Sequence, residues 1–305
     1  METAIKKIKY RVLIPFLIYL RTTFLGDKGK NREELNPKTK MFFIMGSDRN
    51  GSTLLAMLLN RHDEIFLPPE QYALPYSIIS WHLKVFQSWK AFCTESVRNY
   101  AQLNQNWQLQ PSHFSSLENE VSALDSQFHK PSNLFYSVLN SYSEQSGKRA
   151  QFFGDHSPIT SLFYKHIQRE FPTSKYIFLV RHPLDVVLSY SKLTDNPASD
   201  AVYACWKWNN SISAYKWMKK KRPVDVLLMK YEDLVSEPQV QTQLALSFLG
   251  AASQDIVNQS SENHGVRSIG GDGYAHHENL SKPITTASIG GWKKSMDAKA
   301  IEKLQ

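Results

Sequence analysis

The stretch that most constrains the fold is residues 41–70, MFFIMGSDRNGSTLLAMLLNRHDEIFLPPE. It opens with the apolar run 41–45, which is short enough to be a strand buried in a parallel sheet. A loop bounded by Gly46 and Gly51 follows, and an apolar-periodic segment beginning at Ser52 predicts a helix packed on the sheet. Backbone N–H groups and the positive end of the helix dipole converge on such a loop, so this stretch predicts a cradle for an anion.

The loop is close to the phosphate-binding pattern G-x-x-x-x-G-K-[ST] of nucleotide-binding proteins, with one difference. Ser52 occupies the lysine position, so the residue that reaches the β- and γ-phosphates of ATP is missing. Arg49 instead places a forked positive charge inside the loop. We therefore expect a phosphate or sulfate ligand other than ATP with Mg²⁺. An ordinary tight turn between a strand and a helix is the simpler alternative.

The rest of the chain alternates strand-like runs with helical segments. The further expected strands cover residues 65–67, 151–154, 175–180 and 224–229. Between the second and third strands, residues 71–150 are rich in aromatic side chains and poor in glycine, which predicts a helical insertion. This order predicts an α/β fold with a parallel sheet covered by helices on both faces. Such sheets bind ligands at the carboxyl ends of their strands, where Arg49, Arg181 and Tyr231 fall.

Length and composition fit a folded protein. The 305 residues can form one large α/β domain or two small ones, and 42% of them are hydrophobic. The two cysteines, Cys93 and Cys205, cannot form a disulfide framework or a zinc cluster, so we expect a reducing compartment and a cytoplasmic location. The adjacent pair His276 and His277 is a poor metal site, and we expect no metal.

Most of the net charge lies in an N-terminal arm and linker, residues 1–40. It carries ten Lys and Arg residues against four Asp and Glu residues, which leaves only +2 of the net +8 for the rest. We therefore expect no nucleic acid partner. The apolar run at residues 12–20 is far too short to span a membrane. Two interpretations of residues 5–25 stay open: peripheral contact with an anionic membrane surface, or an accessory helix packed on the domain.

Four motifs, taken in chain order, resemble those of the sulfotransferases. RNGST at residues 49–53 resembles their loop for the 5′-phosphosulfate, usually R-S-G-T-T. Arg181, with Ser189 eight residues later, resembles their 3′-phosphate motif. The YEDL segment that starts at Tyr231 resembles one whose tyrosine contacts the nucleotide, and residues 282–292 are similar to the loop that closes over it. The resemblance is closest to the group that includes the tyrosylprotein and many bacterial sulfotransferases.

This resemblance implies a P-loop-like three-layer α/β domain over residues 41–305. Within it we expect an acceptor-side helical insertion at 71–150 and a cofactor-closing loop at 262–296. The implied reaction moves a sulfuryl group from 3′-phosphoadenosine 5′-phosphosulfate (PAPS) to an acceptor hydroxyl, without a metal ion. The residues it places at the cofactor are Arg49, Asn50, Gly51, Ser52, Thr53, Arg181, Ser189, Tyr231, Lys282, Gly290, Gly291, Trp292 and Lys293.

A base should remove the acceptor proton. In the tyrosylprotein branch this base is a glutamate 21 residues after the loop arginine, and that position here is Glu70. His156 stands where many relatives have a lysine that stabilises the leaving phosphate. It either takes over that catalytic role or is a hydrogen-bonded structural histidine.

Two further positions depart from the family pattern. Asp48 stands where a proline often precedes the loop arginine, and its carboxylate would partly neutralise Arg49. Gly291 stands where the tyrosylprotein branch has a cofactor-binding lysine, for which Lys293 and Lys294 are the nearest substitutes.

Two alternative functions remain. A small-molecule or nucleoside kinase would use the same loop, although Ser52 disfavours it. A catalytically silent nucleotide-binding protein is the other alternative, because His156 and Gly291 depart from the pattern. The acceptor itself is open among small molecules, lipids, sugars and peptides. Gln305 falls inside an expected helix, as it would in a truncated chain.

Overall fold

The computed structural model describes residues 17, 32–36, 38–84, 86–103, 111–192, 200–258, 283–296 and 301. Three features of the sequence analysis lie outside these residues. They are the arm at residues 5–25 apart from Leu17, the first part of the expected closing loop with Lys282, and the pair His276 and His277.

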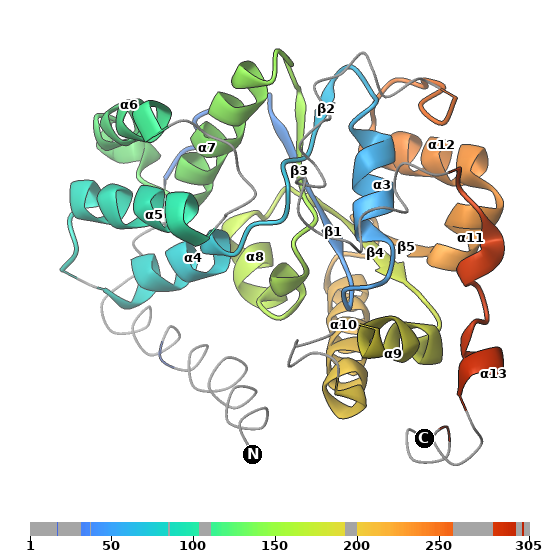
Figure 1. Ribbon diagram of the computed structural model, residues 1–305. Coiled ribbons are helices and arrows are strands. Elements are labelled where there is room, and N and C mark those ends of the chain that lie inside the picture. Colours follow the sequence, from blue (N-terminus) through green and yellow to red (C-terminus); the bar gives the residue numbers. More distant parts are fainter. Residues whose placement is uncertain are drawn as a thin grey trace.

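Five parallel strands form one sheet in the order β2-β3-β1-β4-β5 (Figure 1). Their bounds are β1 (Lys40–Met45), β2 (Ile65–Phe66), β3 (Phe152–Asp155), β4 (Lys175–Val180) and β5 (Val226–Lys230). The chain builds β2 and β3 on one side of β1 and then β4 and β5 on the other. The carboxyl end of β1 therefore lies where the direction of winding changes, which is the usual ligand site of such sheets.

Strand β1 is apolar because it faces two cores. Side chains alternate along a strand, so Phe43 and Met45 enter one hydrophobic cluster while Phe42 and Ile44 enter another. All four side chains are buried. This explains why the run at 41–45 is apolar throughout, without the alternation of a strand that has one solvent-facing side.

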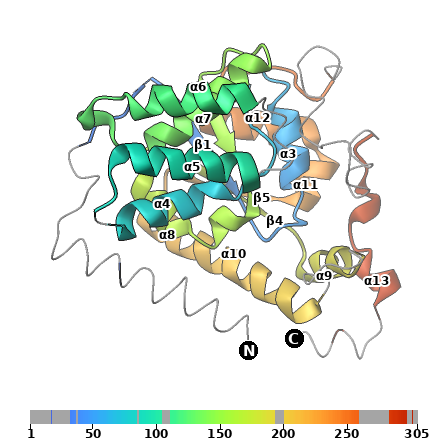
Figure 2. The ribbon, with the colours of Figure 1, turned by 60° about the vertical axis from the view of Figure 1, so that its left-hand side comes forward.

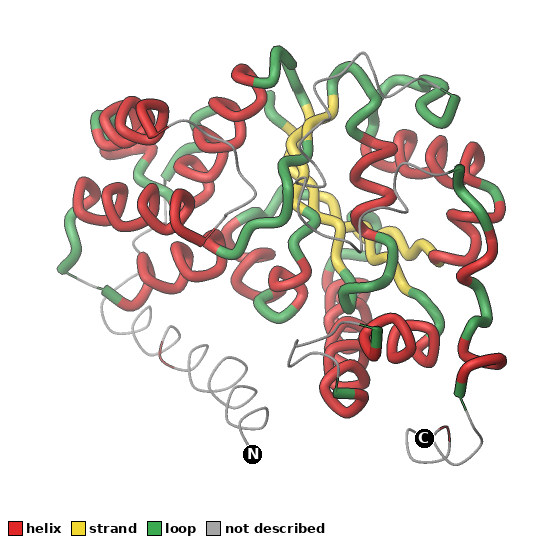
Figure 3. Tube along the Cα trace, viewed as in Figure 1, coloured by secondary structure: helices red, strands yellow, loops and turns green. Residues whose placement is uncertain are grey.

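Helices cover both faces of the sheet, so the fold is the expected three-layer α/β arrangement (Figure 3). One face carries α3 (Ser52–Leu59), α11 (Tyr231–Ser236) and α12 (Pro238–Leu249). The other carries α8 (Tyr164–Glu170), α10 (Ala201–Lys221) and the helices of the insertion. Helix α9 (Pro183–Ser191) packs against α10 and against α13 (Trp292–Ser295). Short 3₁₀ turns are η2 (Ser126–Phe128), η3 (Pro158–Ser161) and η8 (Thr286–Ser288).

The helical insertion follows the second strand, as the sequence predicts. It consists of α4 (Ala73–Leu83), α5 (Trp89–Leu103), α6 (Pro111–Ser122) and α7 (Pro131–Gln145), and Figure 2 shows α4, α5 and α6 stacked in front of the sheet. Its aromatic side chains mostly fill the core, since Trp81, Trp89, Phe92 and Tyr100 are buried. Phe86, between α4 and α5, is fully exposed.

The part of the chain that the structure describes contains no helix both long and apolar enough to cross a membrane. Within the same residues, no group of three or more His, Cys, Asp or Glu side chains could hold a metal ion.

Candidate active site

The loop between β1 and α3 has an unusual backbone. Asp48 and Arg49 both lie in the left-handed region, with φ of 63° and 53°, and Gly51 follows with φ of 94°. Each non-glycine residue in this region costs about 1–3 kcal/mol, so the surroundings must hold the loop in place. Asn50 contributes, because its Nδ2 donates to the Leu179 carbonyl at 2.7 Å and its Oδ1 accepts from the Ser52 N–H at 3.2 Å.

Gly51 is required for space as well as for backbone angle. A Cβ added there would lie 2.4 Å from Cδ2 of Tyr231, the first residue of α11. The Tyr231 ring therefore packs directly on the loop. This contact joins the first and third sequence motifs in space, although they are far apart in the chain.

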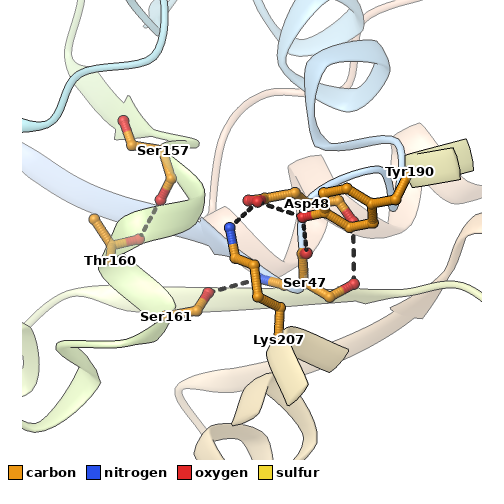
Figure 4. A network of polar contacts seen from close by, with 8 residues as sticks. Ser47, Asp48, Ser157, Thr160, Ser161, Tyr190 and Lys207 are labelled. Atoms are coloured by element: carbon orange, nitrogen blue, oxygen red, sulfur yellow. Dashed lines mark hydrogen bonds and ion pairs between the residues drawn. The ribbon is translucent and has the colours of Figure 1, made fainter. Parts of the chain in front are cut away.

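Asp48 is held by two residues from other elements (Figure 4). Lys207 of α10 forms an ion pair with Asp48 Oδ2, and the Tyr190 hydroxyl of α9 donates to the same oxygen at 2.6 Å. The Tyr190 hydroxyl also lies 3.0 Å from the Ser47 carbonyl oxygen. From the sequence, Asp48 was expected to neutralise part of the Arg49 charge. Lys207 was not predicted, because nothing local in α10 indicates its partner.

Arg49 connects the two expected phosphate sites. Its Nε donates to Ser189 Oγ at 3.0 Å, so the serine assigned to the 3′-phosphate motif also contacts the 5′ loop. Burial lowers the pKa of Arg49, while nearby Tyr190 and Glu70 act to raise it. An arginine side chain is not deprotonated in proteins, so the guanidinium remains a cation.

Arg181, which follows β4, is oriented by three contacts. Its guanidinium lies over the Tyr231 ring, 4.5 Å from the centroid. Its Nη1 donates to the Arg49 carbonyl at 3.1 Å and its Nη2 to the Ser288 carbonyl at 2.9 Å. Its Nε is buried without a hydrogen-bond partner among the described residues. A fixed guanidinium with an unused donor fits an anionic group such as a 3′-phosphate.

The described part of the expected closing loop, residues 283–296, is docked on the start of α9. Asp185 in the first turn accepts from the Gly290 N–H at 2.8 Å and from the Trp292 N–H at 3.1 Å. The His182 and Trp292 rings stack, with centroids 5.1 Å apart and planes 7° apart. Asp185 is therefore a loop-holding residue.

Further contacts link this segment to α11. The Tyr231 hydroxyl and Ser288 Oγ are hydrogen-bonded at 2.6 Å, so Tyr231 contacts the loop of β1, Arg181 and the closing segment together. Gly291 lies next to Leu188 and Asp185 of α9. Lys293 keeps its Nζ 5.8 Å from the centroid of the Trp292 ring.

Glu70 lies on the loop after β2. Its pKa is raised to about 7, first by burial and then by the nearby carboxylate of Asp155. Arg49 and a hydrogen bond from Tyr72 act in the opposite direction. The residue is partly exposed, so the carboxyl group can meet a substrate while the surrounding protein still disfavours its charge.

A buried network behind Glu70 fixes this loop. Asp155 Oδ2 accepts from Gln71 Nε2 at 2.7 Å and from Ser157 Oγ at 3.0 Å, and Ser157 Oγ in turn accepts from the Gln71 N–H at 2.8 Å. The Gln71 side chain also accepts from the Leu74 N–H at 2.8 Å, at the start of α4. Burial raises the pKa of Asp155 to about 6. Asp155 was not predicted as a site residue, although its place at the end of a strand was a usable signal.

His156 lies behind the same loop. It is only 1% exposed, and its Nε2, as the donor, contacts the Pro68 carbonyl oxygen at 3.1 Å. Pro68 is two residues before Glu70, so this hydrogen bond fixes the segment that carries the expected base. A hydrogen-bonded structural histidine would make such a contact.

The described residues of the predicted site thus gather at the carboxyl edge of the sheet. Ser52 and Thr53 form the first turn of α3, beside Arg49. Cationic groups and loop N–H groups surround the ends of β1 and β4, which suits a ligand with two anionic groups. A carboxyl group that titrates near neutral pH lies within electrostatic reach of Arg49. The arrangement can bind a doubly anionic ligand and remove a proton next to it.

Comparison with solved structures bears on the fold. The solved sulfotransferase domain of the Synechococcus PCC 7002 olefin synthase superposes with a TM-score of 0.60 at 23% identity, over 90% of this chain and 97% of that one. The sulfotransferase domain of the curacin biosynthetic pathway gives a TM-score of 0.57 at 20% identity, over 89% and 97% of the two chains. These likenesses confirm the fold.

A curated relative extends over a similar length. A putative protein-tyrosine sulfotransferase of Caenorhabditis briggsae is 22% identical over 269 residues, which is 87% of this chain and 85% of the relative. The model of the sulfotransferase family matches residues 42–255, which include the loop of β1, Glu70, Arg181 and Tyr231. Since that match covers more than half of the chain, this protein belongs to the sulfotransferase family.

Proposed function

We propose that this chain transfers the sulfuryl group of PAPS to the hydroxyl group of an acceptor, with Glu70 as the general base. One observation carries the proposal. Glu70, whose pKa is raised to about 7, lies within electrostatic reach of Arg49 in the anion-binding loop. Family membership and the two arginines at neighbouring strand ends support the same reaction.

The nucleotide would be held by residues that the structure already orients. Arg49 and the N–H groups of the loop after β1 would hold the 5′-phosphosulfate. Arg181 would hold the 3′-phosphate through its unused Nε, with Ser189 nearby on α9. Tyr231 would fix the Arg181 guanidinium by stacking against it. The bound nucleotide supplies an activated sulfuryl group.

Glu70 would accept the proton of the acceptor hydroxyl. A base with a pKa near 7 is a stronger proton acceptor than an ordinary glutamate and is still about half ionised at neutral pH. Burial opposes the ionised form most strongly, Asp155 opposes it as well, and Arg49 favours it. The acceptor belongs to the hydroxyl-bearing small molecules, lipids, sugars or peptides.

Thermal unfolding with 3′-phosphoadenosine 5′-phosphate (PAP), the expected product, tests the proposal without an acceptor. At a concentration about 100 times the Kd, binding to the native state alone adds about 2.7 kcal/mol to the unfolding free energy. We expect PAP to raise the Tm of the parent and of Arg98→Ala, whose side chain is exposed on α5, and to leave Arg181→Ala unchanged. Stabilisation by ATP with Mg²⁺ alone would reject the proposal and favour a kinase.

A further inference from the structure

A second cation besides Arg49 lies on the 5′ loop. The Lys207 side chain is only 13% exposed, and its Nζ contacts Asp48 Oδ2 in the left-handed part of the loop. In Figure 4, Lys207 rises from α10 between this loop and the turn that holds Ser157, Thr160 and Ser161. The same turn contacts the loop, since Ser161 Oγ accepts from the Gly46 N–H at 2.8 Å.

The charge of Asp48 makes this lysine necessary. A carboxylate inside an anion-binding loop repels a phosphosulfate unless a cation neutralises it. Lys207 supplies that cation, and Tyr190 holds the same carboxylate oxygen from the opposite element. Asp48 Oδ1 is buried and has no hydrogen-bond partner among the described residues, so the carboxylate is only partly satisfied.

Lys207 has a single carboxylate partner, Asp48, among the described residues. Burial lowers its pKa to about 7, because the single Asp48 carboxylate replaces only part of the water that would solvate an ammonium group. A second anion beside Nζ would favour the charged form. The loop next to Asp48 is the place where the proposed function puts the 5′-phosphosulfate.

We propose that Lys207 contacts the 5′-phosphate of the bound nucleotide and stabilises the charge that this phosphate gains as the leaving group. The inference rests on the proposed function. In that reaction a bond forms between the acceptor oxygen and sulfur, and the bond between sulfur and the bridging phosphate oxygen breaks. The electron pair of the broken bond stays on the 5′-phosphate, and the acceptor proton passes to Glu70. Lys207 thereby takes the place of the cation that the family pattern has at the His156 position.

Two nucleotide ligands distinguish binding at the 5′-phosphate from binding at the rest of the site. PAP carries both phosphates, whereas adenosine 3′-phosphate lacks the 5′-phosphate. The test measures the Kd of both by calorimetry for the parent, Lys207→Met, Asp48→Asn and the double variant. Lys207→Met should weaken PAP by about 10- to 100-fold, as expected for the loss of one charge-assisted hydrogen bond, and leave adenosine 3′-phosphate within about twofold. Lys216→Met, exposed on the same helix, should change neither affinity.

The double variant distinguishes direct contact from simple neutralisation of Asp48. Asp48→Asn together with Lys207→Met leaves no unpaired carboxylate in the loop. If Lys207 contacts the 5′-phosphate, this variant still binds PAP at least tenfold more weakly than the parent. Recovery of the parent affinity would overturn the inference, because Lys207 would then serve only to neutralise Asp48. The double variant also keeps the test valid if Lys207→Met alone fails to fold.

The affinities of the parent protein for the two nucleotides show whether a failure concerns this inference or the proposed function. A parent that binds PAP more tightly than adenosine 3′-phosphate supports the 5′ site, and the variants then decide the role of Lys207. A parent that binds both equally contradicts a 5′ contact but leaves the 3′ site. A parent that binds neither nucleotide rejects the proposed function itself.

Discussion

Around the ends of β1 and β4, the candidate site contains Arg49, Arg181 and Lys207. Arg181 donates to the Arg49 carbonyl and lies over the Tyr231 ring, and Lys207 pairs with Asp48. Around the ends of β2 and β3 the site contains two carboxyl groups instead, those of Glu70 and Asp155. Burial raises the pKa of both. The first region is suited to hold anions, and the second is suited to accept a proton. Nucleotide binding and proton transfer should therefore respond to different substitutions.

Glu70→Gln is expected to give the largest difference between the effect on kcat and the effect on the affinity for PAP. Glutamine keeps the size of the side chain but cannot accept the acceptor proton, so kcat should fall by about 10²- to 10⁴-fold. The affinity for PAP should be unchanged or slightly tighter, because a carboxylate near Arg49 is lost. The measurements are the conversion of PAPS to PAP with an acceptor found by screening hydroxyl compounds, and the Kd of PAP.

The matched control is Glu144→Gln, an exposed glutamate on α7 whose carboxylate accepts from Asn140 in its own helix. Its kcat should equal that of the parent. A Glu70→Gln variant that keeps more than a tenth of the parent kcat would show that another group takes the proton.

The next prediction acts on the cationic region alone. Gly51→Ala would place a Cβ 2.4 Å from the Tyr231 ring, which carries the Arg181 guanidinium on it. We expect the ring to move and the affinity for PAP to fall by about tenfold, which calorimetry would measure. Gly147→Ala is the control, since Gly147 has φ of 76° but no neighbour within 4 Å of an added Cβ.

Both substitutions force alanine into the left-handed region, at about 1–2 kcal/mol. Both should therefore lower the Tm. Only Gly51→Ala should lower the affinity for PAP. Equal affinities in the two variants would mean that the packing of Tyr231 on the loop does not matter for binding.

The two regions also differ in how many of their site residues could be predicted from the sequence. The cationic region follows from short motifs, because Arg181 comes directly after one apolar strand and Arg49 lies in the short loop after another. Parallel strands bring such positions to one edge of the sheet. Contacts between segments that are distant in the sequence could not be predicted in this way. Lys207 meets Asp48 across 159 positions, and the exposed and buried residues of α10 give no local sign of it.

The carboxylate region was predicted only in part. Glu70 was predicted because it lies 21 residues after the loop arginine, as in the tyrosylprotein branch. The hydrogen-bond network of Asp155, Gln71 and Ser157 was not predicted. Those hydrogen bonds join the end of β3 to the loop after β2, across the helical insertion. Their partners depend on how the insertion folds back, which no local pattern encodes. His156 belongs to the same group, since its contact with Pro68 spans 88 positions.

A smaller effect is expected for His156. His156→Leu removes the donor to the Pro68 carbonyl and should lower kcat by about tenfold through misplacement of Glu70. The affinity for PAP should stay within about twofold. His156→Gln offers an amide N–H in a similar place and should recover most of the lost kcat. The kinetics and the Kd of PAP are measured for both variants.

These variants also decide between the two interpretations of His156. If its imidazolium held the leaving phosphate, both substitutions would weaken PAP by at least tenfold. His166→Gln is the control, because His166 is also buried but lies in α8, with its pKa lowered to about 4. It should change neither kcat nor the affinity for PAP.

The smallest effect concerns stability. The Glu70 pKa is about 7 in the folded protein against an ordinary value of 4.5, so folding favours the protonated carboxyl. That contribution is complete below pH 4.5 and is lost as the pH rises through 7. A glutamine side chain cannot ionise, so Glu70→Gln should nearly match the parent Tm at pH 4.5 and exceed it by about 5 °C at pH 8. Scanning calorimetry at both values, with Glu144→Gln as reference, would measure this. A Tm difference that is the same at both pH values would mean that the cause is packing, and that the Glu70 charge carries no cost in the fold.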